Sequence, residues 1–362
     1  MKKIPVSEII LSLACAAALI FSFFPPVTAE PSAEKGEHEL KDMAGQTFFL
    51  KGRAEKVSIF PPVLWHWLTL DESSGAVFSM ASYLKEDTRE TLLGRLYPDA
   101  FSKKTAVTRI GAVPVGVEQT LYDRPDAVMT WEWFGNEFAG SNYKGIVRIT
   151  SPDDGGRTLY ALFADMTGKH DRYQRILSRY DEKMAELHTS VPEKTDKVPL
   201  VIIRADSMTM WGAKFGRFNN EILTLNAYNA AVKTAKYNGA SNLETLITLN
   251  PEIILLAQYG SVKDPSSIYA NRALSSIDAV RNRRVYAIPA GASRMEGPVE
   301  EPILYRWLNV IINGAGASGF RDEIKNTYKD IYGYTISDDE IDAMLNIKEN
   351  TVSYGYEVFG RN

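Results

Sequence analysis

The sequence is poor in cysteine, with one in 362 residues. A single thiol excludes a disulfide-braced scaffold, a zinc site built from cysteines and an iron–sulfur cluster. The sequence also lacks an excess of positive charge, since 41 lysines and arginines face 45 aspartates and glutamates, and nothing therefore suggests a nucleic-acid-binding surface. Hydrophobic residues at 45% and charged residues at 24% are ordinary for a globular protein and exclude a disordered, collagen-like or polytopic membrane chain.

Catalytic motifs are missing as well. The sequence has no G-x-S-x-G nucleophile elbow, no H-E-x-x-H zinc motif and no phosphate-binding loop. Its acidic residues are numerous but form no recognisable catalytic constellation. We therefore expect a binding protein rather than an enzyme. A ligand sensor module is the alternative from another functional class.

The amino terminus has the features of a secretory signal. Lys2 and Lys3 precede an apolar run from Ile9 to Phe24, which is shorter than the ~20 residues that a membrane-spanning helix needs. Small residues follow this run, and cleavage is expected after Ala29. We therefore predict that residues 1–29 are a signal peptide and that the protein is exported to the periplasm.

Two alternatives stay open for this segment. The apolar run could be retained as a membrane anchor, or Cys15 could carry a lipid. Lipidation fits less well, because Ser12 stands where a lipoprotein signal has leucine and because the apolar run continues to Phe24. Cleavage after Ala29 would leave a mature chain without cysteine, which must then rely on its hydrophobic core for stability.

Short apolar strands alternate with helices along the rest of the chain, which predicts an α/β fold with parallel sheets. Residues 30–44 are polar and charged, and we expect them to form a loose leader. Strands are expected over 56–60, 76–79, 127–131, 200–204, 253–257 and 285–288, and helices over 64–68, 87–96 (with Asp87 as N-cap), 219–237, 241–249 and 300–313.

A long amphipathic segment divides this alternation. From residue 168 to about 190, apolar side chains recur at steps of three and four while charges occupy the other faces, which predicts a helix of about 20 residues. So long a helix is unlike the connections inside one domain. We therefore expect an N-terminal lobe over 30–167, a rigid interlobe helix over 168–190, and a C-terminal lobe with a helical tail over 191–362.

An internal repeat supports two lobes of similar build. Residues 117–128 and 243–254 each contain an apolar residue before glutamate, then leucine, proline and an acid at the third, seventh and eighth positions after that glutamate. Each unit predicts a short helix, a turn fixed by proline and a buried strand. Repetition at this length of match indicates related halves, although helix–proline–strand units also recur independently in α/β proteins.

Several segments, in order, resemble motifs of the periplasmic substrate-binding proteins for ferric siderophores, haem and cobalamin. The second repeat resembles their "L-E-x-L-L-x-L-x-P-D-L-I" motif. The first repeat departs from that pattern at Tyr122-Asp123, Gln46 replaces the usual arginine of the opening motif, and the match is poor after Trp131. The resemblance extends over residues 38–347 and rests on the segments 39–47, 243–254, 284–289, 294–308 and 320–345.

The resemblance implies two α/β lobes joined by one long rigid helix, with the ligand held in a cleft between them. It also implies delivery to the permease subunits of an ABC importer by a monomeric protein. In this family a surface glutamate on each lobe docks on the permease, and the matching positions here are Glu118 and Glu244. The alternative is that both glutamates are ordinary solvated helix residues.

Aromatic and charged residues near the expected strand ends are the candidates for ligand binding, because a cleft site lies where parallel strands end. Aromatic rings with a few cations suit a flat, anionic and partly apolar ligand, and arginine binds carboxylate, catecholate or hydroxamate oxygens with paired donors. The candidates are Trp65, His66, Trp131, Trp133, Phe134, Trp211, Arg217, Tyr259, Arg294 and Glu296.

No resident cofactor or bare metal site is expected. The sequence has four histidines, of which only His66 is well placed, and one histidine does not make a metal site. Haem needs only one or two axial ligands, so His66 or Tyr259 keeps a haem ligand open. An iron complex, and among these a ferric siderophore, is the expected ligand, with haem, cobalamin or another metal chelate as alternatives.

Overall fold

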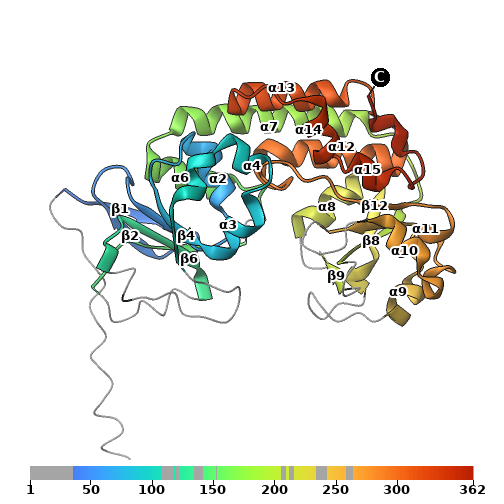
Figure 1. Cartoon of the computed structure of the whole chain (residues 1–362), viewed down its shortest axis with the longest axis horizontal. Coiled ribbons are helices and arrows are strands. Elements are labelled where there is room, and N and C mark those ends of the chain that lie inside the picture. Colours follow the sequence, from blue (N-terminus) through green and yellow to red (C-terminus); the bar gives the residue numbers. More distant parts are fainter. Residues whose placement is uncertain are drawn as a thin grey trace, which may run out of the picture. The chain divides into compact units, whose positions relative to one another are not determined.

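The computed structural model describes residues 36–106, 118, 122–133, 142–151, 153–204, 209–211, 216–233, 243–257 and 264–361. The expected signal peptide therefore lies outside the described residues. Two five-stranded sheets, one on each side of a long helix in the sequence, form the framework (Figure 1). This is the two-lobed α/β fold with parallel sheets that the sequence predicts.

The first sheet is parallel throughout, with the strand order β5-β4-β3-β6-β7. Its central strand, β3, is buried along its whole length, as expected for a sheet covered on both faces. The strands are β3 (Val57–Ile59), β4 (Val77–Ala81), β5 (Lys104–Ala106), β6 (Ala127–Trp131) and β7 (Ile146–Ile149), and the helices are α2 (Leu64–Asp71), α3 (Ser82–Thr88), α4 (Leu92–Leu96) and α6 (Arg157–Thr167).

The helix expected over 87–96 is wrong in its bounds. Asp87 lies inside α3 rather than at an N-cap, and a new helix, α4, begins at Leu92. The leader expected over 30–44 is also wrong in part, because residues 38–41 form β1 (His38–Lys41), which pairs antiparallel with β2 (Thr47–Leu50). The buried Asp42 carboxylate stabilises the turn between these strands by accepting hydrogen bonds from the backbone N–H groups of Ala44 and Gln46 at 3.0 and 2.8 Å.

The second sheet has the parallel order β10-β8-β11-β12, with β9 antiparallel to β8. A single helix over 219–237 is wrong: α8 ends at Thr224, Asn226 adopts a positive φ of 65°, and β10 follows. The strands are β8 (Val198–Arg204), β9 (Thr209–Trp211), β10 (Ala227–Asn229), β11 (Ile253–Leu256) and β12 (Val285–Ala287), and the helices are α8 (Gly216–Thr224), α9 (Leu243–Leu249), α10 (Pro265–Ala270) and α11 (Asp278–Arg281).

The internal repeat has the same backbone geometry in both lobes. Arg124 and Asn250, which precede the two prolines, both adopt a positive φ, 47° and 40°. After each proline, the backbone N–H of the acid donates to a carbonyl at the start of the neighbouring strand: Asp126 to Lys56 at 2.7 Å, and Glu252 to Pro199 at 2.9 Å. The matching turns confirm the repeated proline turn and the strand that follows it, whereas most of the helix expected in the first repeat lies outside the described residues.

The long helix α7 (His170–Ser190) lies between the two sheets in the sequence and has 21 residues. Its apolar stripe, which includes Ile176, Tyr180 and Leu187, is buried, as its periodicity predicts. It packs against α6 and α12 (Gly297–Asn313), and α13 (Phe320–Tyr332) runs beside it (Figure 1).

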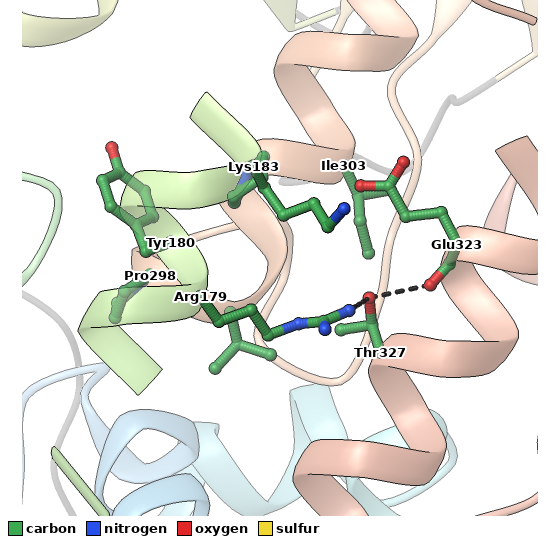
Figure 2. A pocket seen from close by; sticks show the side chains of 9 residues that line it. Arg179, Tyr180, Lys183, Pro298, Ile303, Glu323 and Thr327 are labelled. Carbon is green, nitrogen blue, oxygen red and sulfur yellow. Dashed lines mark hydrogen bonds between the residues drawn. The ribbon is translucent and has the colours of Figure 1, made fainter. Parts of the chain in front are cut away.

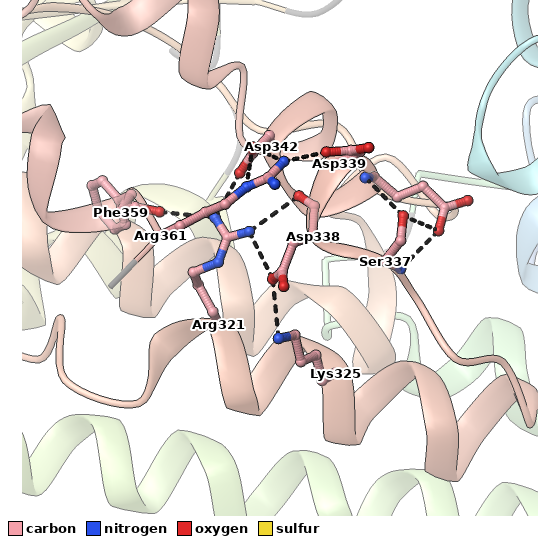
Figure 3. Close-up of polar contacts among 9 residues, drawn as sticks. Arg321, Lys325, Ser337, Asp338, Asp339, Asp342, Phe359 and Arg361 are labelled. Carbon is pink, nitrogen blue, oxygen red and sulfur yellow. Dashed lines mark hydrogen bonds and ion pairs between the residues drawn. The ribbon is translucent and has the colours of Figure 1, made fainter.

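The carboxyl-terminal tail is fastened to α13 by charged side chains (Figure 3). Arg321 donates to the Asp342 carboxylate at 2.8 Å and to the Phe359 carbonyl at 3.1 Å, and Arg361 donates to Asp342 at 2.9 Å. These contacts connect α13 to α14 (Asp338–Met344) and to the 3₁₀ turn η6 (Tyr356–Phe359). The short helix α15 (Ile347–Asn350) lies between these two elements in the sequence.

Candidate functional site

Strand order marks one position in each sheet where a ligand site is expected. In the first sheet the chain proceeds from β3 to β4 and β5 on one side, then returns to β6 and β7 on the other side of β3. In the second sheet it reverses between β8 and β11. Ligands of open parallel sheets bind outside the carboxyl ends of the strands at such a topological switch point. The ends of β3 and β6 and those of β8 and β11 are therefore the positions to examine.

Two stacked indoles lie at the switch point of the first sheet. Trp131 is the last residue of β6, and the ring of Trp133 stacks on it with 4.8 Å between centroids and 12° between planes. The Trp133 side chain is 58% exposed, and an exposed aromatic face is a surface on which a flat ligand can stack. The structure thus brings together two of the predicted ligand residues.

Arg204 lies at the switch point of the second sheet, and sequence reasoning missed it. It is the last residue of β8 and is partly exposed. The sequence did place it at the end of an expected strand, but the strand order that makes this end a switch point was not available from the sequence. Tyr259, the candidate that follows β11, lies outside the described residues.

Trp65 and His66 lie in a buried contact between the lobes. The two residues belong to α2 of the N-terminal lobe and are 0% and 4% exposed. The Trp65 indole N–H donates to His66 Nε2 at 3.0 Å, and burial lowers the pKa of His66 to about 3, which keeps the ring neutral. Coordination of a haem iron through Nε2 would require the hydrogen bond to Trp65 to break. Ligand binding by these two residues stays a prediction.

The segment before α12 supplies the other side of this contact. The Arg294 guanidinium lies 4.6 Å from the centroid of the Trp65 ring, in cation–π geometry. A Glu296 carboxylate oxygen lies 3.9 Å from His66 Nε2. A side chain on Gly297 would meet the His66 ring at 2.7 Å, so only glycine fits there. The structure therefore brings four predicted ligand residues together, two from each lobe.

Glu300 stabilises the segment before α12 through hydrogen bonds to its backbone. Its side chain is completely buried, and its carboxylate accepts hydrogen bonds from the backbone N–H groups of Ala292, Ser293 and Met295 at 2.9 to 3.0 Å. Ser293 Oγ and the Tyr328 hydroxyl also donate to this carboxylate, at 2.8 and 2.6 Å. These bonds offset the cost of a backbone in which Arg294 and Met295 both have a φ of 57°.

Arg217 is engaged within the protein, although the sequence suggested it for the ligand. Its guanidinium lies 3.4 Å from a Glu301 oxygen and 3.8 Å from a Glu221 oxygen, and it covers the ring of Tyr180 at 5.5 Å. Its backbone N–H donates to the Asp153 carboxylate of the N-terminal lobe at 2.7 Å. Arg217 thus contacts the N-terminal lobe, α7 and α12, and its role in ligand binding stays a prediction.

Glu301, in this cluster, is expected to make stability depend on pH. Burial raises the pKa of Glu301 to about 7, against the opposing effect of Arg217. The folded state therefore holds a proton that the unfolded state releases from about pH 4.5 upward, and folding loses stability as the pH rises to about 7. We expect a wild-type loss of about 2–3 kcal/mol between pH 5 and pH 8 from this group.

Urea unfolding of the wild type and of Glu301→Gln at both pH values measures this effect. The glutamine variant should lack this part of the pH dependence, so that the variant gains relative to the wild type at pH 8. An equal pH dependence in both proteins would contradict the assignment.

The remaining candidates divide between described and undescribed residues. Glu118 and Glu244 are helical and exposed, as surface docking would require, and Glu244 lies in the first turn of α9. Trp211 lies in β9, but its side chain is outside the described part of the chain. Phe134 lies outside the described residues altogether.

Within the described ranges, no group of three histidine, cysteine, aspartate or glutamate side chains is arranged to hold a metal ion. None of the helices in those ranges combines the length and hydrophobicity that a bilayer span requires. A depression between α7, α12 and α13 is filled by its own side chains: Arg179 donates to Thr327 Oγ1 at 2.8 Å across it (Figure 2). It leaves no room for a ligand.

Comparison with known proteins finds a family match over part of the chain and a relative of known role. A family model for periplasmic binding proteins matches residues 140–292. The iron-uptake system-binding protein of Bacillus subtilis is 25% identical over 273 residues, which are 71% of this chain and 80% of that protein. Both matches confirm the resemblance found in the sequence.

Solved periplasmic binding proteins share the fold. A periplasmic solute-binding protein from Veillonella parvula has a TM-score of 0.74 and 22% identity, covering 87% of this chain and 98% of that one. A molybdate-binding protein of a Haemophilus influenzae ABC transporter has a TM-score of 0.69 and 14% identity, over 83% and 99% of the two chains. A triscatecholate siderophore-binding protein from Bacillus subtilis has a TM-score of 0.59 and 15% identity, over 78% and 100%.

Proposed function

We propose that this protein is an exported periplasmic binding protein that captures an iron complex, a ferric siderophore above all, and delivers it to the permease of an ABC importer. The observation on which the proposal rests is the sequence relationship to an iron-uptake system-binding protein over most of both chains. The site supports it, because the exposed face of the stacked Trp131–Trp133 pair suits a flat ligand. Haem, cobalamin and other metal chelates are the alternative ligands, and no resident cofactor is proposed.

Titration of the purified mature protein tests this function. Ferric chelates, haem and cobalamin are added in turn while tryptophan fluorescence is followed. The exposed indole of Trp133 should be quenched by a ligand that stacks on it, and Trp133→Leu should lose most of that quenching. Saturable binding of a ferric complex supports the proposal. If the protein bound only haem or cobalamin, that compound would take the place of the siderophore as the proposed ligand. The absence of binding to any metal complex would refute the iron function.

Docking on the permease is proposed to use Glu118 and Glu244. Both carboxylates are exposed at matching positions of the internal repeat, so each lobe presents one to a partner. Exposed charges at the rim of an interface steer association and set its register. We expect the double variant Glu118→Ala with Glu244→Ala to lower uptake about tenfold while the affinity for the ligand stays unchanged.

Uptake of labelled ligand by cells that carry only the variant protein measures this effect. The matched control removes two exposed glutamates elsewhere, Glu182 on α7 and Glu357 in η6. The control should transport normally. Normal uptake by the Glu118/Glu244 double variant would end the docking proposal.

A further inference from the structure

We propose that the N-terminal lobe closes over Glu301 with the loop 153–156, so that separation of the lobes at this contact releases a proton to solvent. The loop connects β7 to α6 in the N-terminal lobe. Its Asp153 carboxylate accepts the backbone N–H of Arg217, the second residue of α8, at 2.7 Å. A Cβ on Gly156 would meet Pro298 of α12 at 3.2 Å. The loop therefore contacts the first turns of two helices of the C-terminal lobe.

The same loop covers the groups that contact the Glu301 carboxylate. A Cβ on Gly155 would meet the Arg217 guanidinium carbon and the Tyr180 hydroxyl at 3.0 Å each. That hydroxyl donates to Glu301 Oε2 at 3.1 Å, and Arg217 Nε lies 3.4 Å from the same oxygen. The Glu301 side chain is only 15% exposed. Lifting the loop would therefore open this cluster to water.

Carboxylates outnumber guanidinium groups among the described residues around Glu301. The charged and titratable groups there are Arg217 and Glu221 of α8, Tyr180 of α7, Asp153 of the loop, Arg157 of α6 over the Tyr180 ring, Glu296 before α12, Tyr305 in α12, and His188 beside Glu221. Asp154, also in the loop, accepts the Thr158 backbone N–H of α6. A negative charge on Glu301 is thus unfavourable in the closed contact, and burial raises its pKa to about 7 against the effect of Arg217.

The direction of the coupling follows from this burial. Water that reaches Glu301 when the lobes separate returns its pKa toward the ordinary value of 4.5. The closed contact therefore holds a proton that the separated lobes release, and protons favour closure until the pH rises through about 7. Between pH 6 and pH 8 the equilibrium should shift about tenfold toward separation. For the proposed function, this means that a ligand held by both lobes is retained more tightly at pH 6 than at pH 8.

Thiol labelling measures the opening of this contact. The mature chain expected after cleavage at Ala29 has no cysteine, so single cysteines can be introduced. Pro298→Cys places a buried thiol beside the loop 153–156, Val201→Cys places one in the core of the second sheet, and Ser276→Cys is an exposed reference. Labelling rates with iodoacetamide, which is uncharged, are divided by the rate of Ser276→Cys at the same pH.

Pro298→Cys should be labelled about tenfold faster than Val201→Cys or more, because it needs only local separation whereas the core thiol needs unfolding of the sheet. The relative rate of Pro298→Cys should rise about tenfold from pH 6 to pH 8. Adding Glu301→Gln, which stays neutral, should reduce this rise to less than about twofold. The control Glu182→Gln makes the same change at an exposed position of α7 and should keep the full rise.

Three results would overturn the coupling. They are a relative rate that does not change with pH, a rise that survives in Glu301→Gln, and equal rates for Pro298→Cys and Val201→Cys, which would mean that the contact opens only when the protein unfolds. None of these measurements uses a ligand, so failure of the iron function leaves their outcome unaffected.

Carbon-13 NMR of the Glu301 carboxyl keeps the test open if Pro298→Cys does not fold. The carboxyl should titrate with a midpoint near pH 7 in the wild type. Gly155→Ala should lower this midpoint to about pH 5–6, because its Cβ and the φ of 71° at this position displace the loop and admit water. An unchanged midpoint in Gly155→Ala, with thermal unfolding near that of the wild type, would show that the loop does not cover Glu301.

Discussion

Replacing Glu300 by alanine should lower the free energy of unfolding by about 4 kcal/mol. Hydrogen bonds to a charged group contribute about 1.5–3 kcal/mol each, and donors left buried without an acceptor cost more. Three backbone N–H groups and the hydroxyls of Ser293 and Tyr328 all donate to this one carboxylate. Removing the carboxylate leaves these five donors without that acceptor, at a position that is completely buried. Urea unfolding of the purified protein measures the loss.

Two further variants should lower the free energy of unfolding by smaller amounts than Glu300→Ala. Glu300→Gln keeps one acceptor oxygen but turns an NH₂ group toward N–H donors, and we expect about half of the alanine loss. Tyr328→Phe removes a single donor, together with the acceptor of the Ala292 N–H, and should cost about 1–2 kcal/mol. The control is Glu357→Ala, which alters an exposed glutamate in η6 and should change stability by less than about 0.5 kcal/mol. If Glu300→Ala matched this control, the carboxylate would not be stabilising the segment.

The Glu300 hydrogen bonds also matter for the candidate site, because the segment that they stabilise contains Arg294 and Gly297. Gly291 cannot carry a side chain, since a Cβ there would meet the Glu300 carboxylate at 2.3 to 2.5 Å. Arg294 in turn covers Trp65 of the N-terminal lobe. One buried carboxylate thus fixes a strained backbone whose residues form the contact between the lobes.

The sequence predicted the elements whose signals are local. The apolar stripe of α7 repeats every three to four residues over 21 positions, and no tertiary contact is needed to recognise it. The turns of the two helix–proline–strand units are also local signals, because proline fixes its own φ angle and cannot continue the preceding helix. In contrast, Asn226 ends a helical pattern by adopting a positive φ, and nothing in the neighbouring residues excluded a continuing helix through that position.

The site was harder to predict because its partners are distant in the sequence. Arg217 looked available until Asp153, 64 residues earlier, and Glu301 were found beside it. Arg204 stood at the end of an expected strand, but only the strand order makes that end a switch point. Glu300 is one of several acids at the start of α12, and its role depends on the backbone N–H groups of Ala292, Ser293 and Met295, which donate to it. The sequence shows the chemistry of each side chain, but it does not show which residues surround that side chain in the fold.

Arg172 is expected to give the second large loss of stability. This buried residue of α7 donates from Nε and Nη2 to the Thr69 carbonyl at 3.0 and 2.8 Å, and from Nη2 to the Ile331 carbonyl at 2.7 Å. Thr69 lies in the last turn of α2 and Ile331 in the last turn of α13, where carbonyls have no partner within their own helix. Nη1 also lies 2.9 Å from Glu72. One guanidinium therefore ties the N-terminal lobe and the carboxyl-terminal helices to α7.

Arg172→Met, which keeps much of the side-chain volume, should lower the free energy of unfolding by about 3 kcal/mol, because it leaves the buried Thr69 carbonyl and the partly buried Ile331 carbonyl without this donor. Arg172→Lys should recover part of the loss, since an ammonium group reaches one carbonyl but lacks the planar fork. Arg175→Met is the matched control, three residues along the same helix and exposed, and should change stability by less than about 0.5 kcal/mol.

Hydrogen exchange distinguishes a loss of this connection from general destabilisation. If Arg172 ties the ends of α2 and α13 to α7, amides near Tyr332 and Glu72 should lose protection in Arg172→Met well before those of β8 and β11, which lie far from it in the sheet core. Uniform loss of protection along the chain would contradict this local role. Unchanged protection near Tyr332, together with a stability equal to that of Arg175→Met, would show that the carbonyls of Thr69 and Ile331 do not depend on Arg172.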